Sequence, residues 1–388
     1  MKKSVRELQV RGKRVLLRVD FNVPMADGDV TDDTRIRASL PTIEYLLEQD
    51  ARIILVSHRG RPKGKVLEAL RMDPVARRLA DILERPVTKA SDVAGASSKA
   101  LAAALQPCEL LLLENVRFHP GEEVNDEELA REMASLADVF VNDAFGTAHR
   151  AHASTVGVAK HLPSVAGLLM SREIESLSRL LAEPARPFIA VLGGIKVSDK
   201  IRVLQNLAGK ADMLLLGGGM ANTFLSAKGF SMGTSIIDND GATFAREMLE
   251  KTRGCLHLPV DLLVAPSVWA GESARVPVDA VPPGLMALDI GPRTVAAYRE
   301  TVVPAGTVFW NGPMGVFENP VFAGGTREMA KAIASCKGVT VVGGGDSIAA
   351  LKETGVYGEI THVSTGGGAS LEFLEGRSLP GIEVLMDR

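Results

Sequence analysis

Short apolar runs recur along the chain, and most of them end in a segment rich in charged residues or in glycine. The runs typical of buried strands cover residues 14–19, 51–57, 86–88, 110–113, 139–141, 188–192, 213–216, 256–258, 262–265, 307–310, 339–342 and 362–364. Segments with apolar residues at helical spacing lie between them, as over residues 73–83. Strands that alternate with helices form parallel sheets covered by helices on both faces. The pattern therefore predicts an α/β protein.

The alternation is interrupted between residues 157 and 185. Residues 157–169 are small and apolar, and Ile174, Leu177 and Leu181 then follow at helical spacing before Pro184 ends the helix. We expect a connecting helix over 171–185, between a first domain of residues 1–170 and a second of 186–371. The alternative is an ordinary helix inside one large domain, but such a domain would exceed the size at which single cores usually divide.

In the first half, the expected strands end in polar or arginine-bearing loops. The residues in these loops are Asp20, Asn22, His58, Arg59, Gly60, Arg61, Arg117, His149 and Arg150. The carboxyl ends of parallel strands meet along one edge of a sheet, where ligands bind. Arginine grips phosphate and carboxylate groups with two parallel hydrogen bonds. Any one of these loops could instead be a solvated basic loop.

Two more arginines lie near the start of a helix. Thr31 or Asp33 is expected to cap the helix that contains Ile43, which places Arg35 and Arg37 close to its first turn. The helix dipole disfavours cations at that end, so a purely structural role for both is doubtful. We call Arg35, His58, Arg61, Arg117 and Arg150, with His149 as a further candidate, the arginine edge. We expect it to bind a small, highly anionic molecule.

In the second half, glycine replaces arginine after the strands. Glycine-rich turns follow five strands, at Gly193-Gly194, Gly217–Gly219, Gly312 with Gly315, Gly343–Gly345 and Gly366–Gly368. Such turns let backbone N–H groups approach phosphate oxygens. We call these turns the glycine edge, and five of them along one sheet edge are hard to explain by turn chemistry alone.

Three charged residues accompany the glycine edge. Lys196 and Lys200 are four residues apart and would share a face of a helix, where they could hold phosphate or be two solvated lysines. Asp346 follows a triple glycine at a helix start. It could bind Mg²⁺, which on a nucleotide takes only one or two protein carboxylates, or it could be a plain helix cap.

Composition limits the partners. The chain has 388 residues, of which 46% are hydrophobic, 23% charged and 4% aromatic, with a formal net charge of −3. This charge argues against broad affinity for nucleic acid or anionic membranes. No apolar run reaches membrane-spanning length, and the first residues contain no signal-peptide pattern. Three cysteines without metal-site spacing predict reduced, buried thiols in a cytoplasmic protein.

Together the motifs resemble the phosphoglycerate kinase family. The stretches that carry the resemblance, in family order over nearly the whole chain, are residues 18–24 (RVDFNVP), 57–62 (SHRGRP), 113–118 (LENVRF), 142–152, 193–200, 216–225, 309–318, 343–347 (GGGDS) and 364–371. The resemblance implies two Rossmann-like domains, each a parallel β-sheet flanked by helices, joined by the connecting helix. It also implies a C-terminal tail, residues 372–388, that packs back on the first, phosphoglycerate-binding domain, while the second domain binds nucleotide.

The resemblance implies Mg²⁺-dependent, reversible phosphoryl transfer between 1,3-bisphosphoglycerate and ADP, giving 3-phosphoglycerate and ATP, by a monomer. The implied substrate-binding residues are Asp20, Phe21, Asn22, Arg35, His58, Arg59, Gly60, Arg61, Arg117 and Arg150. The implied nucleotide-binding residues are Gly194, Lys196, Lys200, Gly218, Asn311, Glu318, Gly344, Gly345, Asp346 and Ser347, with Asp346 as the metal ligand.

Phosphoryl transfer depends mostly on positioning and charge neutralisation. We expect Arg35 and Lys196 to stabilise the transition state, helped by the backbone of Gly367 and Gly368. With the two ligands on different domains, closure about the connecting helix must bring them together and exclude water.

Three positions depart from the family pattern. Arg59 replaces a usual leucine, Ile195 a usual alanine or serine, and Ala287 a glycine near the base pocket. None removes a catalytic charge, although the last two could alter loop packing or the fit of the base.

Two other classes of protein share parts of this pattern. A dehydrogenase would need a GxGxxG turn, and residues 217–219 lack its third glycine. A binding protein that closes on an anion would need no magnesium carboxylate facing two lysines.

Overall fold

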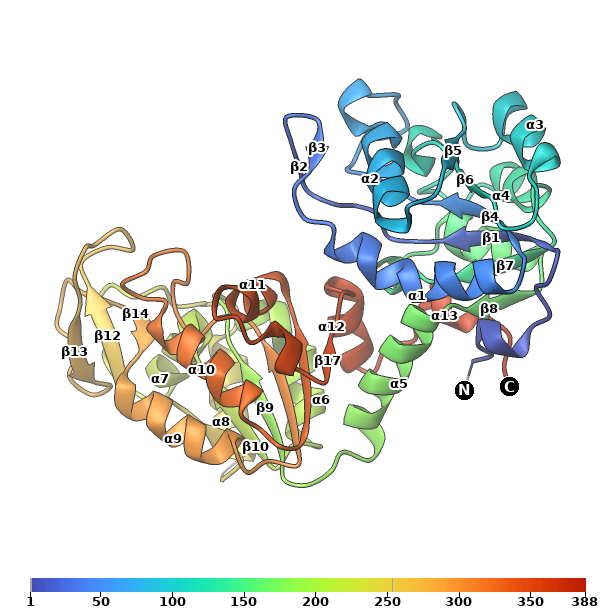
Figure 1. Ribbon diagram of the computed structural model, residues 1–388. Coiled ribbons are helices and arrows are strands. Elements are labelled where there is room, and N and C mark those ends of the chain that lie inside the picture. Colours follow the sequence, from blue (N-terminus) through green and yellow to red (C-terminus); the bar gives the residue numbers. More distant parts are fainter. Residues whose placement is uncertain (1, 253) are drawn as a thin grey trace. The chain divides into compact units, whose positions relative to one another are not determined.

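The computed structural model describes residues 2–252 and 254–388, and they divide into two compact units. The first contains Met1–Glu175 and Ser378–Arg388, and the second contains Ser176–Arg377. The boundary falls within helix α5 (Leu168–Ala182), the expected connecting helix. Figure 1 shows α5 in green. The returning tail is shorter than the expected 372–388, because residues 372–377 belong to the second unit.

The first unit is built on a parallel sheet of six strands, in the order β5-β6-β4-β1-β7-β8. The strands are β1 (Arg14–Arg18), β4 (Arg52–Val56), β5 (Val87–Lys89), β6 (Leu110–Leu112), β7 (Val139–Asn142) and β8 (Ser164–Ala166). A small antiparallel hairpin joins β2 (Met25–Ala26) to β3 (Asp29–Val30). The helices are α1 (Thr34–Glu48), α2 (Asp73–Leu83), α3 (Ala96–Ala104) and α4 (Glu127–Ala134).

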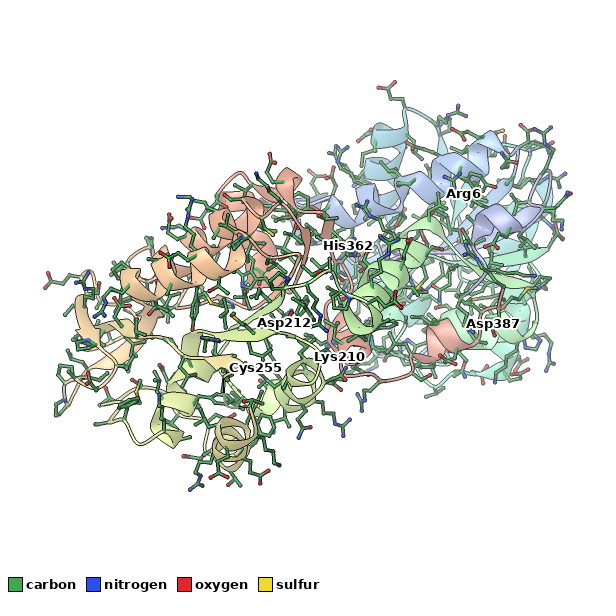
Figure 2. The ribbon with its side chains drawn as sticks, turned by 90° about the horizontal axis from the view of Figure 1, so that it is seen from below. Arg6, Lys210, Asp212, Cys255, His362 and Asp387 are labelled. Atoms are coloured by element: carbon green, nitrogen blue, oxygen red, sulfur yellow. The ribbon has the colours of Figure 1, made fainter. Side chains whose placement is uncertain are left out.

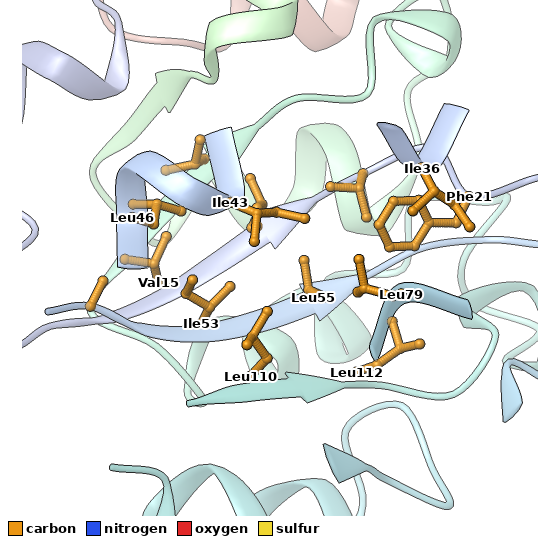
Figure 3. Packing of buried hydrophobic residues seen from close by; sticks show 14 of the residues in the cluster. Val15, Phe21, Ile36, Ile43, Leu46, Ile53, Leu55, Leu79, Leu110 and Leu112 are labelled. Atoms are coloured by element: carbon orange, nitrogen blue, oxygen red, sulfur yellow. The ribbon is translucent and has the colours of Figure 1, made fainter. Parts of the chain in front are cut away.

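Alternate residues of these strands enter two different cores. Figure 3 shows Val15, Ile53 and Leu55 packed against Ile43 and Leu46 of α1, with Leu110 and Leu112 from β6. The intervening residues of the strands, such as Leu16, Ile54 and Leu111, pack on the opposite face with residues of α3 and α4. Burial on both faces explains why the strands are continuous apolar runs.

The C-terminal tail adds a short helix, α13 (Pro380–Glu383), to the first unit (Figure 1). Gly381 N donates to the carbonyl of Ala148 (2.8 Å), and Met386 N donates to the carbonyl of Ser164 (2.9 Å). Near the other end of the chain, Lys2 forms an ion pair with Asp387 (3.1 Å). The two chain ends therefore meet in this unit.

The second unit has its own parallel sheet of six strands, in the order β11-β10-β9-β15-β16-β17. The strands are β9 (Phe188–Leu192), β10 (Met213–Leu216), β11 (Leu256–His257), β15 (Thr307–Asn311), β16 (Val339–Gly343) and β17 (His362–Val363). Numbered along the chain, their order is 3-2-1-4-5-6, that of a Rossmann fold. The first unit differs because its fourth strand, β6, lies between the third and the second.

A second, antiparallel sheet of three strands in this unit was not expected from the sequence. It contains β12 (Asp261–Ala265), β13 (Ala274–Pro277) and β14 (Met286–Ile290). The helices of the unit are α6 (Ile201–Ala208), α7 (Gly218–Ala227), α8 (Ala242–Lys251), α9 (Pro292–Val302), α10 (Gly324–Ala334), α11 (Gly345–Glu353) and α12 (Gly368–Leu374). The runs at 262–265 and 286–290 are apolar like those of the parallel sheet, so periodicity could not separate the two sheets.

Cys108, Cys255 and Cys336 are free thiols, as expected, but each is only half-buried. Figure 2 labels Cys255, whose Sγ lies 3.6 Å from the carbonyl oxygen of Ala211. Burial raises the pKa of the Cys108 and Cys255 thiols, which makes them less reactive. Within the described residues, the structure contains no helix that is both long enough and apolar enough to span a membrane.

Candidate functional site in each unit

The arginine edge follows four neighbouring strands of the first sheet. β6, β4, β1 and β7 are adjacent, and Arg18 at the end of β1 is in register with Val56 of β4 and Asn142 of β7. The loops after these strands therefore begin at one level. The expectation that they share one sheet edge is confirmed.

Asp20 organises one part of this edge. Its Oδ2 accepts a hydrogen bond from Arg35 Nη1 (3.0 Å), and its Oδ1 accepts one from the backbone of Asn22 (3.1 Å). Asn22 Oδ1 in turn accepts from Gly60 N (2.9 Å). Arg35 lies in the first turn of α1, and its pairing with Asp20 offsets the unfavourable helix end.

The expected side-chain cap of α1 is wrong. Asp33 occupies the N-cap position without a capping hydrogen bond, and Asp32 Oδ1 accepts from Thr34 N instead (2.8 Å). The Asp33 carboxylate binds Arg37 (3.0 Å) and Arg78 (2.6 Å). Arg37 is therefore a structural partner of Asp33, in contrast to Arg35.

His58 lies at the centre of the arginine edge and is buried. Burial lowers its pKa well below the ordinary value, and the positive charges of Arg18, Arg117, Arg35 and Arg150 lower it further. His58 is therefore neutral at pH 7. Arg18 Nη2 lies 3.2 Å from His58 Nδ1, and because arginine has only donors, Nδ1 must accept. The proton then belongs to Nε2.

Arg117 combines burial with an incompletely bonded guanidinium. Its Nη1 donates to the carbonyl of Gly60 (2.7 Å), and its Nε lies 3.3 Å from Glu123 Oε1. That second contact lacks hydrogen-bond geometry, so among the described residues the buried Nε has no hydrogen-bond partner. A buried donor without a partner is unfavourable, and an anionic ligand would correct this.

Three other expected substrate-binding side chains behave differently. Arg59 turns away, since its Nη1 donates to the carbonyl of Arg71 (2.7 Å) and the side chain is mostly buried. Phe21 is fully buried in the core beside Ile36 (Figure 3), so only its backbone can face a ligand. Arg61 is exposed and makes no hydrogen bond or ion pair with the described residues.

Beneath His58 lies a buried polar chain that sequence reasoning missed. Arg18 Nε donates to Ser154 Oγ (2.9 Å), Ser154 Oγ donates to Glu122 Oε1 (2.6 Å), and His152 Nδ1 lies 3.6 Å from the same oxygen. Burial acts to raise the pKa of Glu122, but His152 and Arg18 outweigh it, so the pKa is lowered. The only sequence signal was Arg18, a charged residue at the end of an apolar run.

The glycine edge follows five adjacent strands of the second sheet, β10, β9, β15, β16 and β17, which confirms the expectation of one edge. Its glycines allow close backbone approach. At Gly218 φ is +65°, and an added Cβ would lie 2.9 Å from the carbonyl oxygen of Gly194. At Gly312 φ is +95°, and a Cβ would lie 2.4 Å from the carbonyl oxygen of Gly193.

Lys200 occupies the point where the strand order of the sheet reverses, between β9 and β15. Its Nζ donates to the carbonyls of Gly193 (2.7 Å) and Asn311 (3.3 Å), which follow or end those strands. Burial lowers the pKa of Lys200 to about 8, against the opposing effect of Asp346 and Asp199. Ligands of open α/β sheets bind at this switch point.

Lys196 is not on a helix with Lys200, so the expected shared face is wrong. Helical structure begins with a 3₁₀ turn over Ser198–Lys200, and Lys196 precedes it as an exposed residue. The positive φ of Gly194 (+116°) and the turn at Gly193-Gly194 delay the helix start. Lys196 and Lys200 therefore differ in burial and surroundings.

A pocket of about 540 Å³ lies beside the glycine edge. Four of the expected nucleotide-binding residues line it: Gly194, Gly218, Glu318 and Asp346. Two of the departures, Ile195 and Ala287, line it as well. Gly219 and Gly315, two further glycines of the glycine edge, also line it. Further lining residues not expected from the sequence are Asp199, Asn222, Ile236, Val268, Trp269, Met286, Leu288, Pro313, Val316 and Asn319.

Other residues expected to bind the nucleotide form hydrogen bonds within the glycine edge or lie outside the pocket lining. Ser347 Oγ accepts from Gly312 N (2.8 Å), and Asn311 Nδ2 donates to the carbonyl of Gly343 (2.9 Å). Gly344 is the N-cap of α11, so Asp346 lies in the first turn and is not the cap residue. Gly367 and Gly368, the exposed start of α12, do not line the pocket.

Asp289 is a second residue that the sequence did not reveal. Its carboxylate accepts hydrogen bonds from Gly325 N (2.7 Å) and Ile290 N (2.9 Å), and Gly315 packs against it. Burial raises its pKa to about 7. Asp289 therefore anchors both ends of the segment 315–325, which carries Glu318.

The comparisons with known proteins all point to one family, and the matches cover all or nearly all of the chain. The family model described as phosphoglycerate kinase matches residues 5–377. The chain is 57% identical to a phosphoglycerate kinase of Pelotomaculum thermopropionicum and 58% identical to one of Moorella thermoacetica, in both cases over 100% of each chain.

Among solved structures, the fold is similar to that of phosphoglycerate kinase from Coxiella burnetii. The TM-score is 0.90 at 44% identity, and the match covers 99% of this chain and 98% of the other. For phosphoglycerate kinase from Pyrococcus horikoshii the TM-score is 0.87 at 37% identity, with the same coverage.

Proposed function

The chain belongs to the phosphoglycerate kinase family, and from this premise we propose how its residues perform the reaction. The reaction is reversible phosphoryl transfer between 1,3-bisphosphoglycerate and ADP, giving 3-phosphoglycerate and ATP in glycolysis and gluconeogenesis. In our proposal the arginine edge binds the phosphoglycerate and the glycine edge binds the nucleotide. The observation that carries the proposal is this division of chemistry: buried cations after the strands of one sheet, and open glycine turns around a pocket beside the other.

The phosphoglycerate would be held by Asp20, Asn22, Arg35, His58, Arg61, Arg117 and Arg150. Because Arg18 bonds Nδ1 of His58, the neutral ring offers Nε2–H as a donor to a substrate oxygen. The unpartnered Nε of Arg117 offers a second donor, with a positive charge. Donors fixed before the ligand arrives cost little reorganisation when it binds.

Arg35 and Lys196 are the cations proposed to stabilise the transition state. Lys196 is exposed and Arg35 is partly exposed, so both can reach a transferring phosphoryl group. The group spreads its charge over its equatorial oxygens, which these two cations would contact. The backbone N–H groups of Gly367 and Gly368, at the start of α12, would add hydrogen bonds. The acceptor is already a carboxylate oxygen, so no strong general base is needed.

The nucleotide phosphates would be bound by Lys200 and the turn at Gly344, Gly345 and Ser347, and the ribose by Glu318, with Asn311 between them. Lys200 already lies at the switch point of the sheet. A phosphate there would supply the negative charge that offsets its burial. The pocket that Glu318 and Gly218 line has the volume of a small-molecule site.

The residues fit a magnesium ion carried by the nucleotide. Asp346 is exposed in the first turn of α11, lines the pocket, and is close enough to Lys200 to affect its pKa. No cluster of three or more metal-ligating side chains exists in the described part of the chain. One carboxylate, with nucleotide phosphates and water, is the usual protein share of such a site. The bound ion would neutralise phosphate charge.

Transfer requires the two ligands to meet, so turnover must bring the two units' ligands together and exclude water from the acyl phosphate. We predict that the protein is a monomer and that it is located in the cytoplasm. Light scattering after size-exclusion chromatography measures the first of these.

A coupled assay of ATP-dependent 3-phosphoglycerate consumption tests the activity, and no turnover with magnesium present would contradict it. The division between the edges is tested by two variants. Arg150→Ala should raise KM for 3-phosphoglycerate with KM for ATP unchanged, and Lys200→Met should do the reverse. Equal effects on both constants would contradict the assignment.

A further inference from the structure

One large aromatic side chain in the second unit is almost fully exposed. Trp269 has 84% of its surface accessible and lines the pocket of about 540 Å³ beside the glycine edge. The chain has only two tryptophans, and the other, Trp310, is fully buried with its indole N–H bonded to the carbonyl of Gly312 (2.9 Å). An exposed apolar surface at the rim of a pocket is typical of a binding contact.

The loop that carries Trp269 is held on both sides of it. Asn319 Nδ2 donates to the carbonyl of Val268 (2.8 Å) and to that of Ala270 (3.1 Å), the two neighbours of the tryptophan. Asn319 Oδ1 accepts from Val321 N (3.0 Å). The backbone around Trp269 is therefore fixed while its side chain remains in solvent.

Packing against the protein interior also fixes the loop that carries Trp269. Val268 and Ala270 pack against a small core formed by Ala265, Leu288 and Phe322. Both neighbours of Trp269 thus point into the protein, and Trp269 is the residue left outside. A rigid aromatic group presented in this way loses little conformational entropy when a ligand covers it.

The surroundings of Trp269 match one part of a nucleotide. Ile195 and Ile236 also line the pocket and are 62% and 54% exposed. Met286, Ala287 and Leu288 add further apolar lining, whereas Glu318 and Asp346 supply polar groups in the same pocket. A flat, apolar-faced nucleobase suits the apolar lining residues, and the sugar and phosphates suit the polar groups of Glu318 and Asp346.

We propose that Trp269 stacks on the nucleobase of the bound nucleotide and favours purines over pyrimidines. The proposal rests on the glycine edge being the nucleotide site. Stacking needs only a π-face, so it does not separate adenine from guanine. A purine offers a larger face than a pyrimidine, so the gain is greater for ADP and GDP than for UDP.

Calorimetric titration of the full-length protein with ADP, GDP, UDP and tripolyphosphate tests this, with magnesium present throughout. Trp269→Ala should weaken ADP and GDP binding about tenfold, UDP binding less, and tripolyphosphate binding less than twofold. Trp269→Phe, which keeps an aromatic face, should recover most of the affinity. Val260→Ala, another exposed apolar residue of this unit that does not line the pocket, is the matched control and should bind like the parent protein.

Fluorescence gives a second readout, because the two tryptophans differ in exposure. Acrylamide should quench Trp269 strongly in the free protein, and saturating ADP should protect it, whereas tripolyphosphate should not. Trp269→Phe, which retains only buried Trp310, should show neither effect.

Unchanged ADP affinity in Trp269→Ala, or an equal loss for tripolyphosphate, would overturn the stacking proposal and leave the nucleotide site standing. Failure of the parent protein to bind ADP would instead overturn the nucleotide site and the stacking proposal with it.

Discussion

The two units place the proposed anion-binding groups at the same kind of sheet edge but use different chemistry. In the first unit the groups are polar and charged side chains, and the most central of them, neutral His58 and cationic Arg117, are buried. In the second unit they are backbone N–H groups at glycine turns, with the half-buried Lys200 as the central cation. A compact, multiply charged ligand is best held by many side-chain donors, whereas a nucleotide needs open volume as well as phosphate contacts.

Each solution has its own structural requirement. Buried cations need partners, and the chain from Arg18 through Ser154 to Glu122 supplies them beneath the arginine edge. Removing one member of such a buried pair typically costs about 3–5 kcal/mol. The glycine edge needs space more than counter-charges, because backbone from neighbouring turns comes within contact distance of Gly218 and Gly312. The comparison therefore predicts that substitutions on the arginine edge act through the loss of charge. Substitutions on the glycine edge should act through steric clashes.

The largest effect is expected at Arg35. Arg35→Ala should lower turnover about 10³-fold, because it removes a cation proposed to contact the transferring phosphoryl group. Arg37→Ala on the same helix is the matched control, since Arg37 binds Asp33 and not the site, and it should change turnover less than about threefold. Steady-state kinetics with 3-phosphoglycerate and ATP measures both. Similar losses in the two variants would contradict the special role of Arg35.

Lys196 tests the transition-state role on the other unit. Lys196→Ala should lower turnover by about 10²-fold with a smaller change in nucleotide affinity, as for a contact made mainly in the transition state. Lys251→Ala, an exposed lysine of α8 paired with Glu247, controls for the loss of one positive charge. Turnover and calorimetric ADP affinity separate the two effects. A loss of affinity without a loss of turnover would show that Lys196 is a ground-state ligand.

Gly312 tests the steric requirement. Gly312→Ala should lower the free energy of unfolding by about 1–3 kcal/mol, because φ is +95° and the added Cβ would lie 2.4 Å from the carbonyl oxygen of Gly193. Gly345→Ala is the control, since no heavy atom lies within 4 Å of its Cβ position. Urea unfolding of both variants gives the difference. Equal stability would mean that the turn relaxes without cost.

The smallest effect is a pH dependence centred on Lys200. Its pKa is lowered to about 8, so raising the pH from 7 to 9 removes the positive charge that a nucleotide phosphate would bind. ADP affinity should therefore fall with rising pH, by up to about tenfold across this range. In Lys200→Arg the charge persists, so the same titrations should give a nearly flat profile. A parent protein with a flat profile would contradict the role of Lys200.

Local features of the sequence were enough for much of the site. Apolar runs located β9 and β10 to the residue, and helix α2 as well. The parallel alternation placed His58 and Arg117 at one edge, and the structure places Arg117 close enough to lower the pKa of His58. The prediction that Lys196 and Lys200 share a helical face was wrong. A sequence pattern could not show that the glycine turn delays the start of the helix.

What the sequence determined by itself was the type and order of elements, the strand ends that carry chemistry, and the family. These depend on residue types and spacing along the chain, which are local. Only the tertiary structure decided that Arg59 turns toward Arg71, that Arg18 and Glu122 are joined through Ser154, and that Trp269 lines the pocket beside the glycine edge. Those outcomes depend on contacts between residues distant in sequence, where burial and competing partners choose which way each side chain turns.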